Sequence, residues 1–303
     1  MKTIGITGGT GLVGRVITRL LVNKGYRVII FTRHLRPESD GVSYAYWDAN
    51  KQDISIAALQ QLDGIIHLAG EGVADKRWTP QRKLQILESR TIGTSFITNK
   101  ILQHAPNCKV FVGASAIGYY GADKGGRPFT ETDNASTDFL GSTCKAWEEA
   151  SESIEGKIRR VLIRIGIVLS TEGGAFKEFA KPVKFGVAPL LGGGKQTVSW
   201  IHIGDLAALF VYALENEMMQ GVYNGVAPVP VAQSQLMYSI RKNSKGISIP
   251  IPVPAFVLKI MLGEMSIEVL KSATVSSHKT EQAGFQFQYT TINKAVTALL
   301  GNA

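Results

Sequence analysis

The sequence has few cysteines, no evident metal-ligand pattern and no long apolar run. Its only cysteines, Cys108 and Cys144, stand far apart, and neither belongs to a cluster of cysteines and histidines of the kind that binds a metal. No apolar run approaches the roughly 18 residues that a membrane-spanning helix needs. The most apolar C-terminal run, residues 255–262, is interrupted by Lys259. A disulfide framework, a metal site and a membrane span are therefore not expected.

A secretory signal is also missing from the N-terminal segment. Residues 1–14 contain one lysine and then become rich in glycine, with neither the apolar core nor the small-residue cleavage site of a signal peptide. We therefore expect a cytoplasmic protein. With 303 residues, of which 45% are hydrophobic and 19% charged, the chain has the composition of a soluble globular protein with one large domain or a domain and a smaller lobe.

Clusters of basic residues interleaved with aromatics are absent too. Lysine and arginine number 33 against 24 acidic residues, a net charge of +9, but the basic residues occur singly or in pairs such as Arg159-Arg160. This scatter favours anionic ligands such as phosphates over a nucleic-acid surface. We expect a small-molecule substrate and neither a nucleic-acid nor a membrane partner.

The first 115 residues alternate short apolar strands with helices whose apolar positions lie three and four apart. One helix starts at Leu12 and is closed by Gly25, and another starts at Thr79-Pro80. Strands are predicted at residues 2–7, 26–32, 64–69, 109–114, 160–169 and 221–227. Continuous apolar runs are typical of parallel strands covered on both faces. The predicted fold is α/β, a Rossmann-type doubly wound parallel sheet.

From Gly173 onward the composition shifts toward glycine and proline, with three consecutive glycines at 192–194 and five prolines between 228 and 254. We therefore predict a dinucleotide-binding domain over residues 1–172, to which residues 200–227 return. Residues 173–303 then form a smaller C-terminal substrate lobe.

A glycine-rich turn joins the first strand to the first helix, where a dinucleotide fingerprint must lie. In such a turn, backbone N–H groups approach a diphosphate at the positive end of the helix. Alternatively, the glycines merely let the helix pack close to the sheet. The candidate cofactor-binding residues of this turn are Gly8, Thr10, Gly11, Leu12, Val13 and Gly14.

The end of the second strand bears on which nicotinamide nucleotide is bound. A free ribose 2′-hydroxyl is usually held by an acidic residue at this point. Here Thr32 and Arg33 follow the strand instead, and a guanidinium suits a 2′-phosphate. The sequence favours NADP(H) over NAD, unless Arg33 is only a solvated charge.

Further motifs run along most of the chain, including Leu-Ala-Gly-Glu at 68–71, Gly-Tyr-Tyr-Gly at 118–121 and Trp-Ile-His-Ile-Gly-Asp at 200–205. With them the chain resembles the extended branch of the short-chain dehydrogenase/reductase superfamily. It is most similar to the subgroup called epimerase family protein, which ends in a C-terminal domain of unknown function. The resemblance implies that NADP lies against Thr32, Arg33, Leu68, Ala69, Gly70 and Arg90, with Glu71 near its ribose or nicotinamide end.

Members of this superfamily move a proton with the Tyr of a Tyr-x-x-x-Lys pair, helped by an upstream Ser or Thr. The phenol must have a pKa lowered by a neighbouring lysine and the cofactor. Ser115, at the end of the predicted strand 109–114, fits the serine position. Lys145 stands at the expected distance, but Gly141 occupies the tyrosine position. The other matches to the spacing, at 120–124 and 238–242, are read as coincidences.

Tyr119 and Tyr120 follow Ser115 closely enough to border the same pocket, so either could donate a proton or simply form an aromatic wall. His202 is interpreted as a hydrogen-bonded structural residue and Asp205 as the cap of a helix that begins at Leu206. Two hypotheses remain open. The protein is an NADP(H)-dependent oxidoreductase or epimerase-like enzyme, or it is a non-catalytic NADP(H)-binding sensor or scaffold, as a monomer or homodimer.

Overall fold

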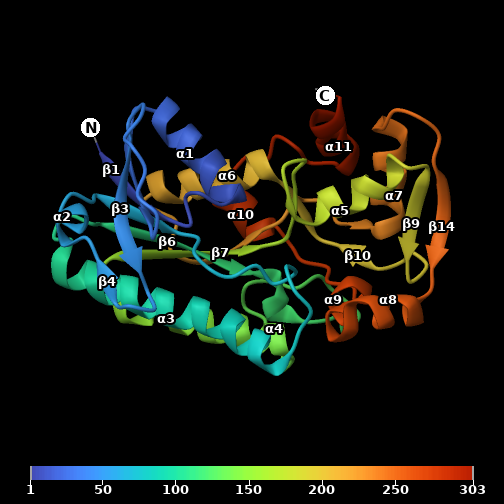
Figure 1. Ribbon diagram of the computed structural model, residues 1–303, viewed down its shortest axis with the longest axis horizontal. Coiled ribbons are helices and arrows are strands. Elements are labelled where there is room, and N and C mark those ends of the chain that lie inside the picture. The colour runs from blue at the N-terminus through green and yellow to red at the C-terminus, as the bar shows by residue number, and fades with distance from the viewer. Residues whose placement is uncertain (1, 302–303) are drawn as a thin grey trace.

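Eight strands form the central sheet of the computed structural model, which describes residues 2–301 (Figure 1). The strand order is β12-β7-β6-β5-β1-β2-β3-β4, and every pair is parallel except β3 with β4. The strands are β1 (Thr3–Thr7), β2 (Arg27–Thr32), β3 (Val42–Asp48), β4 (Asp53–Ile54), β5 (Gly64–His67), β6 (Val110–Ala116), β7 (Arg159–Ile165) and β12 (Gly221–Gly225). The predicted doubly wound parallel sheet is confirmed.

Helices cover both faces of this sheet (Figure 1). On one face lie α1 (Leu12–Asn23) and α6 (Ile203–Glu215), which pack on each other. On the other lie α3 (Pro80–His104) and α4 (Phe139–Glu149), with the short α2 (Ile56–Leu59) beside α3. The sheet is built outward in opposite directions from its middle: β2 and β3 follow on one side of β1, and β5, β6 and β7 on the other. At this switch point a crevice opens at the carboxyl ends of β1 and β5, where ligands of such folds bind.

The helix boundaries follow the predicted signals. The Thr79 hydroxyl accepts a hydrogen bond from the N–H of Arg82 at 3.1 Å, and Pro80 opens α3. After α1 the chain turns at Gly25 with a φ of 83°, a conformation that favours glycine. Both predictions are confirmed.

One strand prediction needs correction, and one strand was not predicted. Residues 160–169 are not one strand, because the chain bends at Gly166, where a Cβ would lie 2.6 Å from the carbonyl oxygen of Ser199. Beyond it, β8 (Ile167–Leu169) leaves the main sheet and pairs with β11 (Trp200–His202). The strand β3 is not among the predicted strands, because its residues are mostly half-buried and its apolar run at residues 44–47 is short.

The C-terminal lobe has a core of its own, built around Phe176, Trp200 and Leu236. Its elements are α5 (Gly174–Val183), β9 (Val187–Leu191), β10 (Thr197–Val198), β13 (Val231–Ala232), α7 (Gln233–Asn243), β14 (Ile249–Val253), α8 (Ala255–Leu262), α9 (Ser266–Leu270) and α11 (Ile292–Leu300). The helix α10 (His278–Gln282) returns to the edge strand β12. The division at residue 172 stays a prediction. Within residues 2–301 no helix is long and apolar enough to cross a bilayer.

Asp205 does not cap a helix at Leu206, as the sequence analysis had it. The helix α6 begins at Ile203, and its cap is Nδ1 of His202, which accepts the N–H of Gly204 at 3.0 Å. The Asp205 carboxylate instead accepts the backbone N–H groups of Gln288 and Tyr289, at 3.0 and 2.9 Å. Burial raises the pKa of Asp205, and these two bonds partly oppose that shift. Asp205 thus fastens the C-terminal segment to α6.

Replacing Asp205 with alanine should lower the free energy of unfolding by about 2–4 kcal/mol, because two backbone N–H groups lose a charged acceptor. Urea unfolding followed by circular dichroism measures the change. Asp205→Asn, which keeps one acceptor oxygen, should lose less, and the exposed Glu178→Ala is the control. Equal stability of Asp205→Ala and the unaltered protein would contradict this assignment.

Candidate functional site

A pocket of about 340 Å³ opens at the carboxyl ends of β1, β2, β3 and β5. Nine of the thirteen predicted cofactor-binding residues line it: Gly8, Thr10, Gly11, Thr32, Arg33, Leu68, Ala69, Gly70 and Glu71. Phe31, Trp47, Asp48, Ala49, Asn50, Glu88, Ser89 and Gly93 complete the lining. Segments widely separated in the sequence therefore meet at the crevice that the strand order creates.

The glycine-rich turn forms one wall of this pocket. Gly8 has a φ of 70°, and a Cβ there would lie 2.9 Å from the carbonyl carbon of Leu68, so only glycine fits between the two strand ends. Gly11 precedes α1, and no side chain among the described residues caps this helix. The N–H groups of the first turn are therefore left for a ligand, and a diphosphate is the anion that this geometry suits.

Three other predicted cofactor residues of this turn are not among the pocket lining. A Cβ on Gly14 would overlap the carbonyl oxygen of Gly8, so its absence permits close packing of α1 on the turn. Val13 packs against the core between α1 and the sheet. Leu12 approaches Gly173 and Gly174 at the start of the lobe. Their contact with a cofactor stays a prediction.

At the end of β2 the pocket presents a cation and no carboxylate. Arg33 is exposed, and the Thr32 hydroxyl accepts the N–H of His34 at 3.2 Å. The nearest acidic residue on the neighbouring strand, Asp48, turns Oδ1 toward its own backbone, where it accepts the N–H of Asn50 at 3.0 Å. The sequence analysis missed residues 47–50 because it did not recognise β3, although Tyr-Ala-Tyr-Trp before an aspartate was a usable strand signal.

Two arginines of α3 lie behind the opposite end of the pocket. Arg82 is buried and pairs with the carboxylate of Glu71 at 3.1 Å. Arg90 lies against Gly70, with its guanidinium 5.0 Å from the Trp147 ring, and burial lowers the pKa of Arg90. Arg90 therefore lies beside Gly70 but is not among the residues that line the pocket. Its predicted contact with a cofactor stays untested.

A buried histidine connects the ends of β1 and β5. His67 ends β5, and its two ring nitrogens lie 2.6 Å from the Thr7 hydroxyl and 3.0 Å from the Thr94 hydroxyl. Burial lowers the pKa of His67 to about 4, so the ring is neutral near pH 7. It links β1, β5 and α3 and carries no charge into the crevice.

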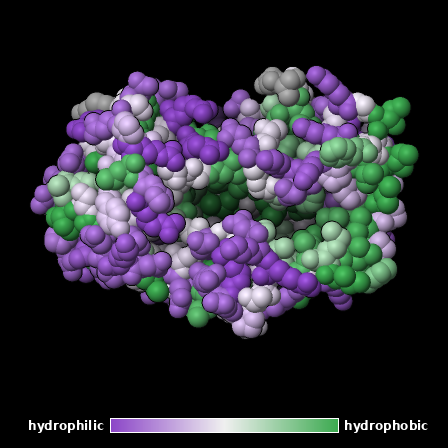
Figure 2. Space-filling view, viewed as in Figure 1, coloured by the Kyte–Doolittle hydropathy of each residue, from purple (hydrophilic) through white to green (hydrophobic). Residues whose placement is uncertain are grey.

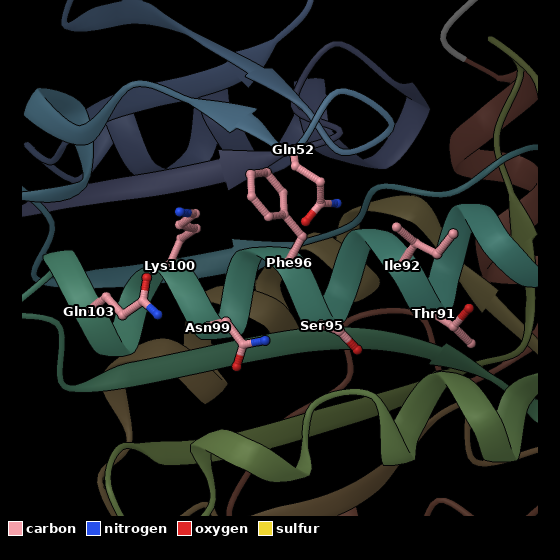
Figure 3. A pocket seen from close by; sticks show the side chains of 8 residues that line it. All are labelled: Gln52, Thr91, Ile92, Ser95, Phe96, Asn99, Lys100 and Gln103. Atoms are coloured by element: carbon pink, nitrogen blue, oxygen red, sulfur yellow. The ribbon is translucent and has the colours of Figure 1, made fainter.

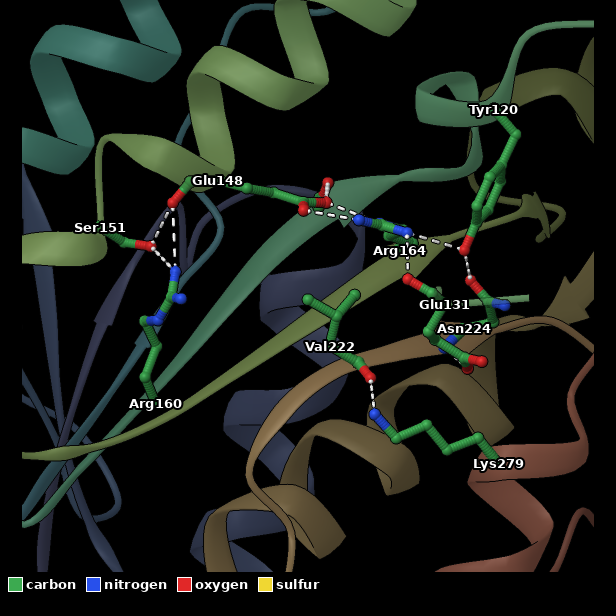
Figure 4. A network of polar contacts seen from close by, with 10 residues as sticks. Tyr120, Glu131, Glu148, Ser151, Arg160, Arg164, Val222, Asn224 and Lys279 are labelled. Atoms are coloured by element: carbon green, nitrogen blue, oxygen red, sulfur yellow. Dashed lines mark hydrogen bonds and ion pairs between the residues drawn. The ribbon is translucent and has the colours of Figure 1, made fainter. Parts of the chain in front are cut away.

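Two of the candidate catalytic residues, Ser115 and Tyr120, belong to a second cluster. Figure 4 labels its members Tyr120, Glu148, Arg164 and Asn224. Arg164 of β7 forms two bonds of 2.8 Å with the carboxylate of Glu148 on α4, and both side chains are largely buried. The Ser115 hydroxyl donates to Oε1 of Glu148 at 2.6 Å. Arg164 also donates to the Tyr120 hydroxyl at 2.9 Å, which in turn donates to Oδ1 of Asn224 at 2.7 Å. We call these five residues the Arg164 cluster.

Burial alone would lower the pKa of Arg164, but the bonds with Glu148 and Tyr120 raise it, so the guanidinium stays charged. Burial raises the pKa of Tyr120 to about 12, against the opposing influence of Arg164. A fully buried phenol with a pKa this far above neutral is a poor proton donor to a substrate near pH 7. Tyr119 is half-buried, with its ring 3.4 Å from the Arg164 guanidinium carbon.

The position expected for the superfamily's tyrosine has no room for a side chain. Gly141 lies in the first turn of α4, and a Cβ there would overlap the carbonyl oxygen of Ser136. Lys145, one turn further, is exposed and lies 3.6 Å from Glu149. The Tyr-x-x-x-Lys pair is therefore missing in space as well as in sequence.

Another hollow, of about 460 Å³, lies on the outer side of α3 (Figure 3). The side chains of Thr91, Ser95, Asn99 and Gln103 follow one another along this helix, and Lys100 is the single charged residue of the lining. This set offers no acid–base pair. Among residues 2–301 no group of three or more His, Cys, Asp or Glu could hold a metal ion.

A phosphate-binding turn at the switch point of a parallel sheet defines a dinucleotide-binding α/β protein. The chain belongs to the NAD dependent epimerase/dehydratase family, which matches residues 4–224. Residues 253–299 match a domain of unknown function, DUF1731. The resemblance drawn from the sequence is thereby confirmed, including its C-terminal domain.

Curated relatives and solved structures agree with this assignment. The chain is 35% identical over 303 residues to the epimerase family protein YfhF of Bacillus subtilis, covering 99% of this chain and 98% of that one. It is 33% identical to an epimerase family protein of Staphylococcus aureus strain N315, covering 99% of both. The crystal structure of human epimerase family protein SDR39U1 (isoform 2) with NADPH is similar at a TM-score of 0.88 and 27% identity, covering 99% of this chain and 100% of that one.

Gly141→Ala should lower the free energy of unfolding by about 1–3 kcal/mol, because the new methyl group overlaps the Ser136 carbonyl. In most helices the same change stabilises by about 0.5–1 kcal/mol. Gly93→Ala in α3 is the matched control, since a Cβ there meets its nearest neighbour, Trp47, at an ordinary 3.8 Å. Chemical unfolding should thus give opposite signs for the two variants. A stabilising Gly141→Ala would show that a side chain fits there after all.

Proposed function

We propose that this protein is an NADP(H)-dependent oxidoreductase or epimerase-like enzyme acting on a small, anionic or sugar-like molecule. Arg33 carries the proposal, because it places a guanidinium at the end of β2 where NAD-specific sites hold a carboxylate. The human relative crystallised with NADPH supports the same preference. A cytoplasmic location and a monomeric or homodimeric state belong to this proposal.

The pocket residues divide the binding of such a cofactor among themselves. The N–H groups at the start of α1 would hold the diphosphate, and Thr32 with Arg33 would hold the 2′-phosphate. The backbone from Leu68 to Gly70 would lie along the rest of the molecule. A bound nicotinamide supplies a hydride or accepts one, and the chain has to orient the substrate and move the proton.

The proton donor in this proposal is Tyr119. Of the two tyrosines that follow Ser115, it is the one that is not fully buried, and its ring rests on the charged Arg164. Ser115 already donates to Glu148, so it acts by holding that carboxylate on Arg164 and not by protonating a substrate.

A second candidate function is a non-catalytic NADP(H)-binding sensor or scaffold. The closed position at Gly141 favours it, since the tyrosine of the superfamily's proton relay cannot be accommodated there. Both candidates need the same cofactor pocket and differ only in turnover.

Arg33→Ala should weaken NADPH binding by about 10- to 100-fold and leave NADH binding nearly unchanged, because one charge-assisted contact to the 2′-phosphate is lost. Isothermal titration calorimetry measures both affinities. Arg36→Ala, an exposed arginine three residues further on, is the control. Equal losses for the two nucleotides would contradict the assignment of Arg33 to the 2′-phosphate. If neither nucleotide gave heat on titration, the proposal that the protein binds NADP(H) would be overturned.

Turnover separates the enzyme from the sensor. NADPH oxidation with a panel of carbonyl and sugar-nucleotide substrates should be seen in the nicotinamide absorbance and fall by about 100-fold or more in Tyr119→Phe, since general acid catalysis contributes that much. NADPH affinity should be unchanged in this variant. Tight NADPH binding without turnover of any substrate would favour the sensor, and full activity of Tyr119→Phe would exclude Tyr119 as the donor.

A further inference from the structure

The far end of the C-terminal lobe exposes an unusual number of large apolar side chains. Figure 2 shows them as a continuous green area over the end of the molecule that carries β9, β14 and α8. The exposed residues are Phe185, Ile247, Ile249, Ile251, Phe256, Ile260 and Met261. We call this surface the lobe-end patch.

The patch comes from elements that are bonded to one another. The N–H of Ile249 donates to Gly186, next to Phe185, and β14 pairs with β9 over its whole length. Helix α8 follows β14 directly, and Leu258 is its only buried residue although seven of its eight residues are apolar. A helix that is apolar nearly all round normally has its faces covered. In this structure the rest of the chain covers only one face of α8.

The surroundings of the patch are positively charged. Residues 179–204 and 218–263 contain no aspartate or glutamate, while they carry Lys181, Lys184, Lys195, Arg241, Lys242, Lys245 and Lys259. Lys184, Lys245 and Lys259 are exposed within or next to the patch itself. The acidic residues nearest to it in the sequence are Glu178, on α5, and Glu264, which pairs with Lys83.

The structure argues against two protein occupants. A second copy of the chain, seated patch to patch, would bring two acid-free basic surfaces together. A partner strand added to the open edge of β14 would need backbone N–H groups there. Ile249, Ile251 and Val253 direct theirs toward β9, and the alternate positions that face the open edge are Pro250 and Pro252, which have none.

We propose that the lobe-end patch docks on an anionic lipid bilayer, with its apolar side chains in the interface and its lysines on the headgroups. Exposed Phe, Ile and Met surrounded by lysine are the features of surfaces that lie in a bilayer interface, and anionic lipid supplies the missing negative charge. Phe185 and Ile247, exposed by 79% and 92%, lie just before β9 and β14, at the same end of this parallel pair, and enter the interface first. This departs from the expectation of no membrane partner and concerns docking on the surface, not spanning.

Co-sedimentation of the whole protein with vesicles tests the proposal. The protein should bind phosphatidylcholine vesicles that contain phosphatidylglycerol, with affinity falling as salt rises, and should bind phosphatidylcholine alone far more weakly. Phe185→Ser/Ile247→Ser should weaken binding by about tenfold or more. Lys245→Ala and Lys259→Ala should each weaken it by about fivefold.

Met218→Ser is the matched control, because Met218 is 88% exposed but follows α6 at the other end of the molecule. All variants should keep the unfolding temperature and NADPH affinity of the unaltered protein, so docking is tested separately from the proposed function. Absence of binding to the anionic vesicles, or equal loss in Met218→Ser, would overturn the proposal. So would a dimer in analytical ultracentrifugation that Phe185→Ser/Ile247→Ser abolishes, since the occupant would then be a second copy.

Discussion

The ion pair between Arg164 and Glu148 is the interaction on which the arrangement around the candidate active site depends. A buried guanidinium is costly unless it is paired and its remaining donors are bonded. Here Glu148 takes two of its bonds, Tyr120 takes another, and the ring of Tyr119 covers it. Removing either charge would leave the other uncompensated inside the protein. The pair joins β7 to α4, and the bond from Ser115 joins β6 to the same carboxylate.

This pairing changes the chemistry open to the neighbouring residues. Ser115 stands where the superfamily places a substrate-binding hydroxyl, but its proton is directed at Glu148. Gly141 stands where the tyrosine would be, and the Ser136 backbone fills that space. The family's fold is thus combined with a different polar centre, in which an arginine–glutamate ion pair takes the place of a lysine and tyrosine pair.

The two ends of the molecule have different characters. The crevice at the ends of β1, β2 and β5 is polar, lined by backbone N–H groups and by Arg33, as a phosphate-bearing ligand requires. The far end of the lobe is apolar and basic, and its open strand edge is blocked by prolines. Asp205 connects the halves by holding the backbone at Gln288 and Tyr289, so the segment after α10 is fixed relative to α6.

Local signals were sufficient for much of the fold. The strand at β1, the turn from Gly8 to Gly14 and the cap at Thr79 each depend on neighbouring residues, and the structure has them where the sequence indicates. Local signals did not predict the strands correctly where the apolar pattern was weak or where the path of the chain depended on tertiary contacts. The half-buried β3 has only a short apolar run at residues 44–47. At Gly166 the chain leaves the main sheet, and Ser199 of the lobe lies too close there for a side chain.

The sequence by itself determined the dinucleotide turn, the arginine at the end of β2 and the absence of the Tyr-x-x-x-Lys pair, because each is a matter of residue type at short spacing. Only the tertiary structure decided that Ser115, Tyr120 and Asn224 belong to one hydrogen-bond network around the Arg164–Glu148 pair. It also decided that Asp205 holds a distant backbone and that most apolar residues of α8 face outward. These contacts join residues that are distant in the sequence, more than a hundred residues apart for Tyr120 and Asn224. Tertiary packing, not the local sequence pattern, decides which groups are hydrogen-bonded and which side chains are buried.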